Sequence, residues 1–232
     1  MDDEEKERLL SRVDLLESLS PAQISALSQT EPLMSLTENQ ILYGPRQFSQ
    51  TLYLLLSGRM HLYKAAGGGG EQQTFEVLTA GMFFGVHVLT GRPSQLYAQA
   101  LEPSWVALMS LSRFRELAEG NVEVSLKMAQ LLSQRVSLYQ SRMADIALKE
   151  VPARLASLLL HLCEREGIVT SEGHYRLPTH YTHTQLSEMI GAKRVSVTRA
   201  FGVLKKKPAI EVRRRIVYIK DLKALKALAK EE

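Results

Sequence analysis

Basic and hydroxyl side chains are concentrated at residues 193–199, in a spacing that suits contact with the bases of DNA. Arg194 and Arg199 lie less than two helical turns apart, so both can project from the first half of one helix. Arginine donates two hydrogen bonds to guanine O6 and N7, and an apolar side chain can pack on the thymine methyl. The segment therefore predicts a DNA-reading helix whose contact residues are Lys193, Arg194, Val195, Ser196, Thr198 and Arg199.

A helix-turn-helix would position these side chains. Gly191 separates two amphipathic segments, at a tight turn that needs a residue tolerant of positive φ. Leu186, Ile190 and Val197 recur at helical spacing and can pack the two helices together. In such a motif the first half of the second helix enters the major groove, and we expect His183, at the start of the first helix, to contact DNA too. The pattern disfavours the alternative, an ordinary helical hairpin with a solvated basic face.

The net charge of +4 is unevenly distributed. Residues 150–232 carry 16 basic and 9 acidic side chains, whereas residues 1–149 carry 13 and 16. The excess positive charge surrounds the helix-turn-helix, as binding to phosphates requires. Residues 209–219 alternate loosely between apolar and polar types and predict a two-stranded wing, which the run Arg213–Arg215 interrupts. We expect Arg213 and Arg214 to contact phosphates.

The first half of the chain has a different character. Residues 4–28 have helical periodicity, and Ser20 followed by Pro21 predicts the start of a second short helix. Residues 31–112 contain short apolar runs separated by glycine-rich turns, which predicts an antiparallel barrel or sandwich. The run Gly67–Gly70 is interpreted as a flexible hairpin tip. It does not fit a phosphate-binding loop, because no Lys-Ser or Lys-Thr pair and no helix follow it.

Residues 113–149 return to helical periodicity, with apolar residues at spacings of four, three, four and three. This heptad pattern predicts a dimerisation helix, although the same face could pack on its own barrel. The predicted dimer seam is Leu132, Val136, Tyr139, Met143 and Ile146. Pro152 can begin the next helix. We therefore predict N-terminal helices and strands over 1–112, the dimerisation helix over 113–149, and a winged helix-turn-helix over 150–232.

Several classes of protein are disfavoured. The single cysteine, Cys163, allows neither an intrachain disulfide nor a cysteine metal cluster. The sequence has no nucleophile–base pair and no histidines at metal-ligand spacing, so we expect no catalytic residues, no metal site and no enzyme activity. The acidic segment Met1–Glu5 lacks the apolar core of a signal peptide. No apolar run approaches the about 18 residues that span a membrane, and we expect a cytoplasmic protein with no membrane partner.

These elements together resemble the Crp/Fnr family of bacterial transcription regulators over nearly the whole chain. Within it, Phe84–Gly91, Leu155–Cys163 and Arg194–Arg199 are most similar to the nitrogen-control regulators of cyanobacteria, whose recognition helix carries Arg-Val-x-Val-Thr-Arg. The resemblance implies an α+β fold: an N-terminal antiparallel β-roll of the cyclic-nucleotide-binding type, a long dimerisation helix and a C-terminal winged helix-turn-helix. It also implies a homodimer on a pseudo-palindromic site in double-stranded DNA, with RNA polymerase as a further partner.

The resemblance also implies an effector pocket between the roll and the long helix, at Phe84, Gly85, Val86, His87, Arg92, Tyr97, Arg135 and Tyr139. Phe84–Val86 and Arg135 match positions at which the nitrogen-control regulators hold 2-oxoglutarate, which makes this acid the preferred effector. Cyclic AMP is disfavoured, because Val86 stands where the family has a ribose-binding glutamate. His87 matches the axial histidine of carbon-monoxide-sensing haem members, but the other haem ligand does not match, so haem is disfavoured too. A regulator that binds no ligand and is controlled by its abundance remains open.

Overall fold

The computed structural model describes residues 1–65 and 71–230, and its contacts divide the chain into two compact units. The roll unit consists of residues 1–64 and 75–136, and the winged-helix unit consists mainly of the residues from 137 onward. The division falls inside the long helix, and our three-segment division of the chain stays a prediction. The predicted hairpin tip at Gly67–Gly70 lies outside the described residues.

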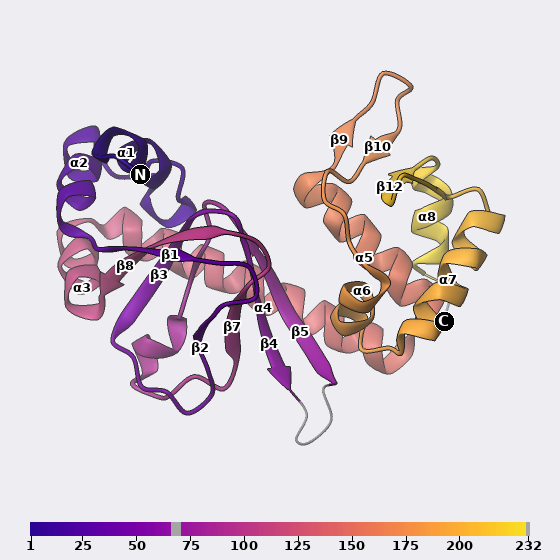
Figure 1. Cartoon of the computed structure of the whole chain (residues 1–232), viewed down its shortest axis with the longest axis horizontal. Helices are drawn as coiled ribbons and strands as arrows, with labels where there is room; N and C mark the ends of the chain where they lie inside the picture. The colour runs from indigo at the N-terminus through magenta and orange to yellow at the C-terminus, as the bar shows by residue number, and fades with distance from the viewer. Residues whose placement is uncertain (66–70, 231–232) are drawn as a thin grey trace. The chain divides into compact units, whose positions relative to one another are not determined.

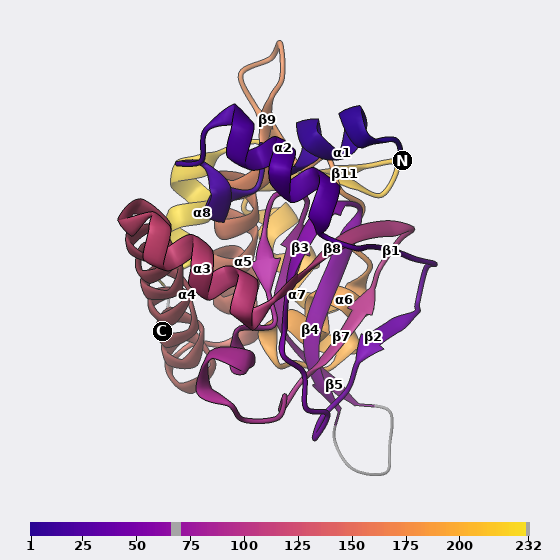
Figure 2. The same ribbon diagram turned by 90° about the vertical axis from the view of Figure 1, so that its left-hand side faces the viewer.

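The roll is built from two four-stranded sheets with helices at one end (Figure 1, Figure 2). Its sheets have the strand orders β1-β8-β3-β6 and β2-β7-β4-β5. Strand β3 pairs antiparallel with β6 and β8, and β7 pairs antiparallel with β2 and β4, which confirms the predicted antiparallel roll. The strands are β1 (Leu33–Leu36), β2 (Ile41–Tyr43), β3 (Thr51–Ser57), β4 (Arg59–Ala65), β5 (Gln72–Thr79), β6 (Phe83–Phe84), β7 (Tyr97–Ala100) and β8 (Ser104–Ser110).

Helices α1 and α2 lie together at one end of the roll (Figure 1, Figure 2). Ser20 caps α2 as predicted: its side chain accepts from the backbone N–H of Gln23, and the Gln23 side chain accepts from the backbone N–H of Ser20. Pro21 follows in the first turn, where its missing N–H costs no hydrogen bond. The helices are α1 (Asp3–Leu10), α2 (Pro21–Thr30), α3 (Leu111–Gly120) and α4 (Val122–Leu148), with short 3-10 helices at Asp14–Leu16 and Val86–Thr90.

Strand β3 contributes side chains to two hydrophobic cores, one on each of its faces. Side chains alternate between the faces of a strand, and residues 52–56 are all buried because both faces are covered. Leu52, Leu54 and Leu56 join the cluster that includes the helices α1, α2 and α4, whereas Tyr53 and Leu55 face the roll interior. Phe83 and Phe84 divide in the same way on β6. The roll therefore holds the start of α4 against its helical cluster.

The winged-helix unit is organised around α5 (Val151–Glu166), which contacts α6, α7 and α8. Pro152 lies in the first turn of α5, as the sequence predicts. A small sheet of order β11-β12-β10-β9 flanks the helices. Its strands and the remaining helices are β9 (Ile168–Val169), β10 (Tyr175–Arg176), α6 (His183–Ile190), α7 (Arg194–Lys206), β11 (Ile210–Arg213), β12 (Ile216–Ile219) and α8 (Leu222–Leu228).

Candidate nucleic-acid interface

The turn between α6 and α7 has the geometry that the sequence predicts. Thr182 begins α6 with a capping box, in which it exchanges hydrogen bonds of 2.9 and 3.1 Å with Gln185. Gly191 ends α6 with φ +63° and donates its N–H to the carbonyl of Ser187. This left-handed conformation costs glycine little, and only three residues separate the end of α6 from the start of α7.

Helix α7 has one buried face and one exposed face. The buried face consists of Val197, Ala200, Phe201 and Leu204. The exposed face brings Lys193, Arg194, Thr198 and Arg199 together, whereas Ser196 is half-buried. Val195 is 59 % exposed, although it is apolar. Apart from Ser196, the predicted contact residues of this segment are thus exposed, so that a valine can meet a thymine methyl and arginines can reach base edges.

His183 is directed at α7. Its Nδ1 lies 2.9 Å from the hydroxyl oxygen of Thr198, and its ring stacks on Phe201 with centroids 4.8 Å apart. Burial, and then the positive charges of Arg194 and Lys205, lower the pKa of His183 below its ordinary value. A neutral His183 therefore links α6 to α7. The sequence predicts that His183 contacts DNA. With Nδ1 directed at Thr198, only Nε2 remains for such a contact.

The wing is a hairpin with a two-residue connection. Arg213 pairs with Ile216 across the hairpin, and Arg214 and Arg215 between them have φ of +48° and +67°. Two positive φ values in a two-residue hairpin are the signature of a type I′ turn, which prefers Asn-Gly. Arginine here is strained, and such strain concentrates at functional sites. The guanidinium of Arg213, which precedes the turn, donates two hydrogen bonds of 2.7 and 3.0 Å to the Glu211 carboxylate.

Arg215 belongs to the basic run that the sequence singles out, but it was not among the expected contact residues; it shares the wing tip with Arg214. Both side chains are exposed, whereas the Arg213 guanidinium is already paired with Glu211 and lies over the ring of Tyr218. Arg214 and Arg215 separate two short apolar runs, and this two-residue interruption could have predicted a two-residue turn. Arg214 and Arg215 are therefore better candidates for phosphate contacts than Arg213.

Replacing the wing tip with Arg214→Asn/Arg215→Gly should separate stability from DNA affinity. The Asn-Gly pair suits positive φ, so the free energy of unfolding should rise by about 1–3 kcal/mol with the strain removed. The affinity for DNA should fall, and the slope of log affinity against log salt should become shallower by about 0.9 for each lost phosphate contact. Thermal unfolding and anisotropy titrations at several salt concentrations measure both effects.

The matched control is Arg214→Lys/Arg215→Lys, which keeps both charges and the strained backbone. It should leave the stability and the salt slope close to those of the wild type. DNA binding by the Asn-Gly variant that matched the wild type at every salt concentration would contradict a phosphate contact at the wing tip.

Helix α4 has an exposed stripe that differs from the predicted dimer seam. Exposed residues recur at spacings of four and three along it: Ala129, Ser133, Val136, Gln140, Met143 and Ala147. Val136 and Met143 belong both to this exposed stripe and to the predicted seam, and they are 52 % and 71 % exposed. Leu132 packs against the roll core, Tyr139 is half-buried, and Ile146 is exposed beside the stripe. Within the roll unit, α4 packs on the core through Val124, Met128 and Leu132, and Ala129, Ser133 and Val136 are exposed.

Arg135, one of the predicted effector residues, forms a buried ion pair with Glu76. Arg135 Nε lies 3.2 Å from Glu76 Oε1, and the two side chains are only 12 % and 3 % exposed. The guanidinium of Arg135 also donates to the Phe83 carbonyl oxygen and lies over the Phe83 ring, 4.5 Å from its centroid. The residue expected to bind an acidic effector is thus already paired with an internal carboxylate, Glu76.

The other predicted effector residues have separate surroundings. Phe84 is fully buried, and Gly85 adopts φ +82°, where a Cβ would lie 2.7 Å from the Tyr53 ring. Val86 and His87 follow in the 3-10 helix, with the His87 ring edge-on to Tyr43 at 5.4 Å. Their remaining partners in the predicted site are an exposed Arg92, Tyr97 stacked on Tyr63 with centroids 5.0 Å apart, and Tyr139, which belongs to the winged-helix unit.

Burial lowers the pKa of His87, so its ring is neutral at neutral pH. Its Nε2 is buried without a hydrogen-bond partner among the described residues. Within the same part of the chain, no cluster of three or more His, Cys, Asp or Glu side chains could hold a metal ion. None of the helices over residues 1–65 and 71–230 is long and apolar enough to cross a membrane.

Comparison with known families matches both units. Residues 33–121 match the family described as a cyclic nucleotide-binding domain, and residues 153–228 match the Crp-like helix-turn-helix domain. Neither is an enzyme family. The chain is 28 % identical over 184 residues to the global nitrogen regulator of Nostoc sp. (strain PCC 7120), covering 78 % of this chain and 82 % of that protein. It is 23 % identical to a CRP-like cAMP-activated global transcriptional regulator of Mycobacterium tuberculosis, covering 94 % and 97 %.

Solved structures show the same fold. A CooA mutant from Carboxydothermus hydrogenoformans superposes with a TM-score of 0.80 at 22 % identity, covering 94 % of each chain. FixK2 from Bradyrhizobium japonicum superposes with a TM-score of 0.77 at 19 % identity, covering 88 % of this chain and 99 % of that one. The α+β arrangement of a roll, a long helix and a helix-turn-helix is therefore shared with both.

Proposed function

Because the chain belongs to the Crp/Fnr family of DNA-binding transcription regulators, we propose that it acts as a homodimer on a pseudo-palindromic site, with one α7 in each of two major grooves. The observation that carries this proposal is the exposed face of α7, on which Arg194, Val195 and Arg199 project while the opposite face is buried. Family members bind DNA and dimerise. RNA polymerase stays a predicted partner.

The exposed stripe of α4 supports the dimer. A side chain as apolar as Val136 or Met143 gains free energy when a second copy removes it from water. The four-and-three spacing of the stripe is that of helices that pack as a coiled coil. Two-fold pairing along this stripe would give the two α7 helices the symmetry of a pseudo-palindrome.

For control of the regulator, we propose a small acid such as 2-oxoglutarate that competes with Glu76 for Arg135. A carboxylate of the ligand would accept the hydrogen bonds that Arg135 now donates inside the roll, and charge-assisted bonds of this kind are the strong ones. The relative from Nostoc is a nitrogen regulator, whereas the name of the mycobacterial relative states activation by cAMP. Neither haem nor cyclic AMP is part of the proposal.

A second candidate is a regulator that needs no effector. The buried pair of Glu76 and Arg135 favours it specifically, because the internal carboxylate already satisfies the guanidinium that a ligand would need. In this case the free protein holds the DNA-competent form, and its abundance sets the response.

Calorimetric titration with 2-oxoglutarate and with cyclic AMP separates the two candidates. We expect heat from 2-oxoglutarate alone, and Glu76→Gln should tighten its binding about tenfold or more by removing the competing carboxylate. The control is the double variant Glu76→Gln/Arg135→Met, which should bind no 2-oxoglutarate. The single Arg135→Ala variant is unsuitable, because an unpaired buried carboxylate costs about 3–5 kcal/mol of stability.

Heat from cyclic AMP alone would contradict control by a small acid. If neither ligand gives heat and the unliganded protein binds DNA with nanomolar affinity, the protein is the effector-independent regulator instead.

A further inference from the structure

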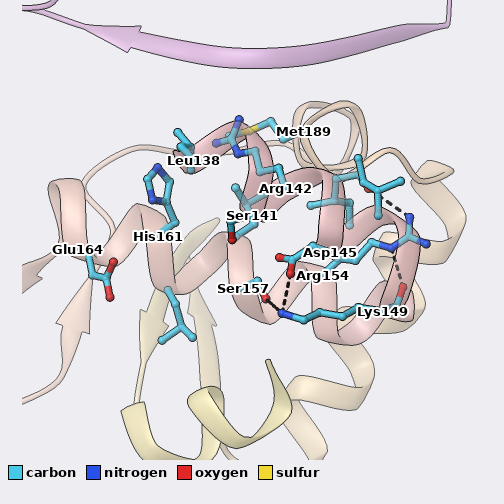
Figure 3. A pocket seen from close by; sticks show the side chains of 14 residues that line it. Leu138, Ser141, Arg142, Asp145, Lys149, Arg154, Ser157, His161, Glu164 and Met189 are labelled. Atoms are coloured by element: carbon cyan, nitrogen blue, oxygen red, sulfur yellow. Dashed lines mark hydrogen bonds and ion pairs between the residues drawn. The ribbon is translucent and has the colours of Figure 1, made fainter. Parts of the chain in front are cut away.

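A half-open pocket of about 270 Å³ lies within the winged-helix unit, among the last turns of α4, the helix α5 and the end of α6 (Figure 3). It contains none of the predicted effector residues of the roll. Its volume is just below the about 300–1,000 Å³ of sites for drug-sized ligands, so it suits a small molecule. Apolar side chains, among them Leu158 and Met189, form part of its lining.

One side of the pocket presents His161 and Arg142, which lie on the same side in Figure 3. The His161 Nε2 atom is buried without a hydrogen-bond partner among the described residues. Burial first, and then the positive charges of Arg142 and Arg165, lower the pKa of His161 to about 4. A neutral imidazole can donate from Nε2, and a buried nitrogen without a partner gains from a ligand that accepts this hydrogen bond.

The end of the pocket near the α4–α5 junction is closed by polar contacts. Lys149 Nζ lies 2.6 Å from Asp145 Oδ1 and donates to the Ser157 hydroxyl at 3.0 Å. Arg154 donates to the Lys149 carbonyl at 2.8 Å and to the carbonyl of Ile190 at 3.5 Å. Asp145 thus already has a cationic partner, and the lining holds three cationic side chains against two acidic ones. This balance favours an anionic ligand.

We propose that this pocket binds a small organic carboxylate with an apolar body. The carboxylate would accept hydrogen bonds from Arg142 and from His161 Nε2, and the body would cover Leu158 and Met189. An uncharged molecule of the same shape could not form the charge-assisted bond with Arg142 that makes recognition strong. The site is separate from Arg135 and its ion pair with Glu76.

The position of the pocket would let a bound ligand change the affinity for DNA. It would contact α4 and also the last turn of α6, which leads through Gly191 into α7. A ligand that prefers one arrangement of these helices shifts the protein toward that arrangement. This consequence rests on the proposed function, whereas binding of the carboxylate does not.

Sodium benzoate is the probe, and the methyl group of Met189 is the reporter. In the full-length protein with carbon-13 methionine methyls, benzoate at millimolar concentrations should shift the Met189 resonance and leave that of Met143, on the exposed stripe, unchanged. Benzyl alcohol, which has the same ring without the carboxylate, should bind at least about tenfold more weakly. Equal binding of the two compounds, or no shift of Met189 with benzoate, would overturn the proposal.

Variants then test the two anchoring groups. Arg142→Gln and His161→Leu should each weaken benzoate binding about tenfold, whereas His161→Gln, which retains a donor, should bind more tightly than His161→Leu. The matched control is Arg165→Gln, which removes a charge near His161 from a residue outside the lining. A loss with Arg165→Gln as large as with Arg142→Gln would show general electrostatics and overturn the site. The remaining methionine resonances report whether each variant is folded, and DNA affinity is measured separately.

Discussion

The Val136→Asp variant should sediment as a monomer and lose tight binding to the DNA sites of the wild type. Val136 lies in the middle of the exposed stripe of α4, where two copies would bury it against each other. Two unpaired carboxylates in that interface would cost several kcal/mol, because a buried charge costs more than the about 2–7 kcal/mol of a buried neutral polar group. Sedimentation velocity gives the mass, and an anisotropy titration of the same sample gives the DNA affinity.

The matched control for this variant is Gln134→Asp. Gln134 is exposed on the same helix but lies outside the exposed stripe, so the change adds the same charge at similar cost to the helix. This variant should remain dimeric. A Val136→Asp protein that stays dimeric and binds DNA as before would show that the dimer interface lies on another surface.

Arg194→Ala and Arg199→Ala should each weaken binding to the specific site by about 1–3 kcal/mol and should relax its sequence preference. Both guanidiniums lie on the exposed face of α7, where they can donate two hydrogen bonds to guanine. Most of this loss should be absent on a random duplex, because non-specific binding depends on phosphates. Competition titrations with specific and random duplexes at one salt concentration measure the difference.

Lys206→Ala is the matched control, since Lys206 is an exposed cation at the other end of α7. If Lys206 contacts a phosphate, the Lys206→Ala substitution should weaken binding to the specific and the random duplex equally. An equal loss on both duplexes for the arginine variants as well would place Arg194 and Arg199 on phosphates and contradict base reading by α7.

The fold was predictable where local signals and tertiary packing agree. Gly191 marks a turn that needs positive φ, and Ser20-Pro21 marks a helix start, so both positions could be assigned without contacts. Short strands with glycine turns predicted an antiparallel barrel or sandwich, and the family resemblance implied the roll. The two cores on either side of β3 could not be predicted, because a strand buried on both faces has no alternation in its sequence.

The candidate site was predictable only where a residue acts from its own helix. Arg194 and Arg199 needed only helical spacing, and both are exposed as expected. The pairing of Arg135 with Glu76 joins residues far apart in the chain, and no spacing rule indicates it. The dimer seam stays a prediction for a related reason: heptad spacing identifies apolar faces, but it does not show that Leu132 packs on the core of the roll.

Methylation interference on a duplex that the wild-type protein selects from a random pool tests the central claim most directly. Methyl groups at guanine N7 block the major-groove edge that arginine reads. We expect two symmetric clusters of interfering guanines, with centres about 10–10.5 base pairs apart or a multiple of that spacing. A single cluster, or no interference from methylated guanine N7, would contradict a homodimer that reads two major grooves with α7.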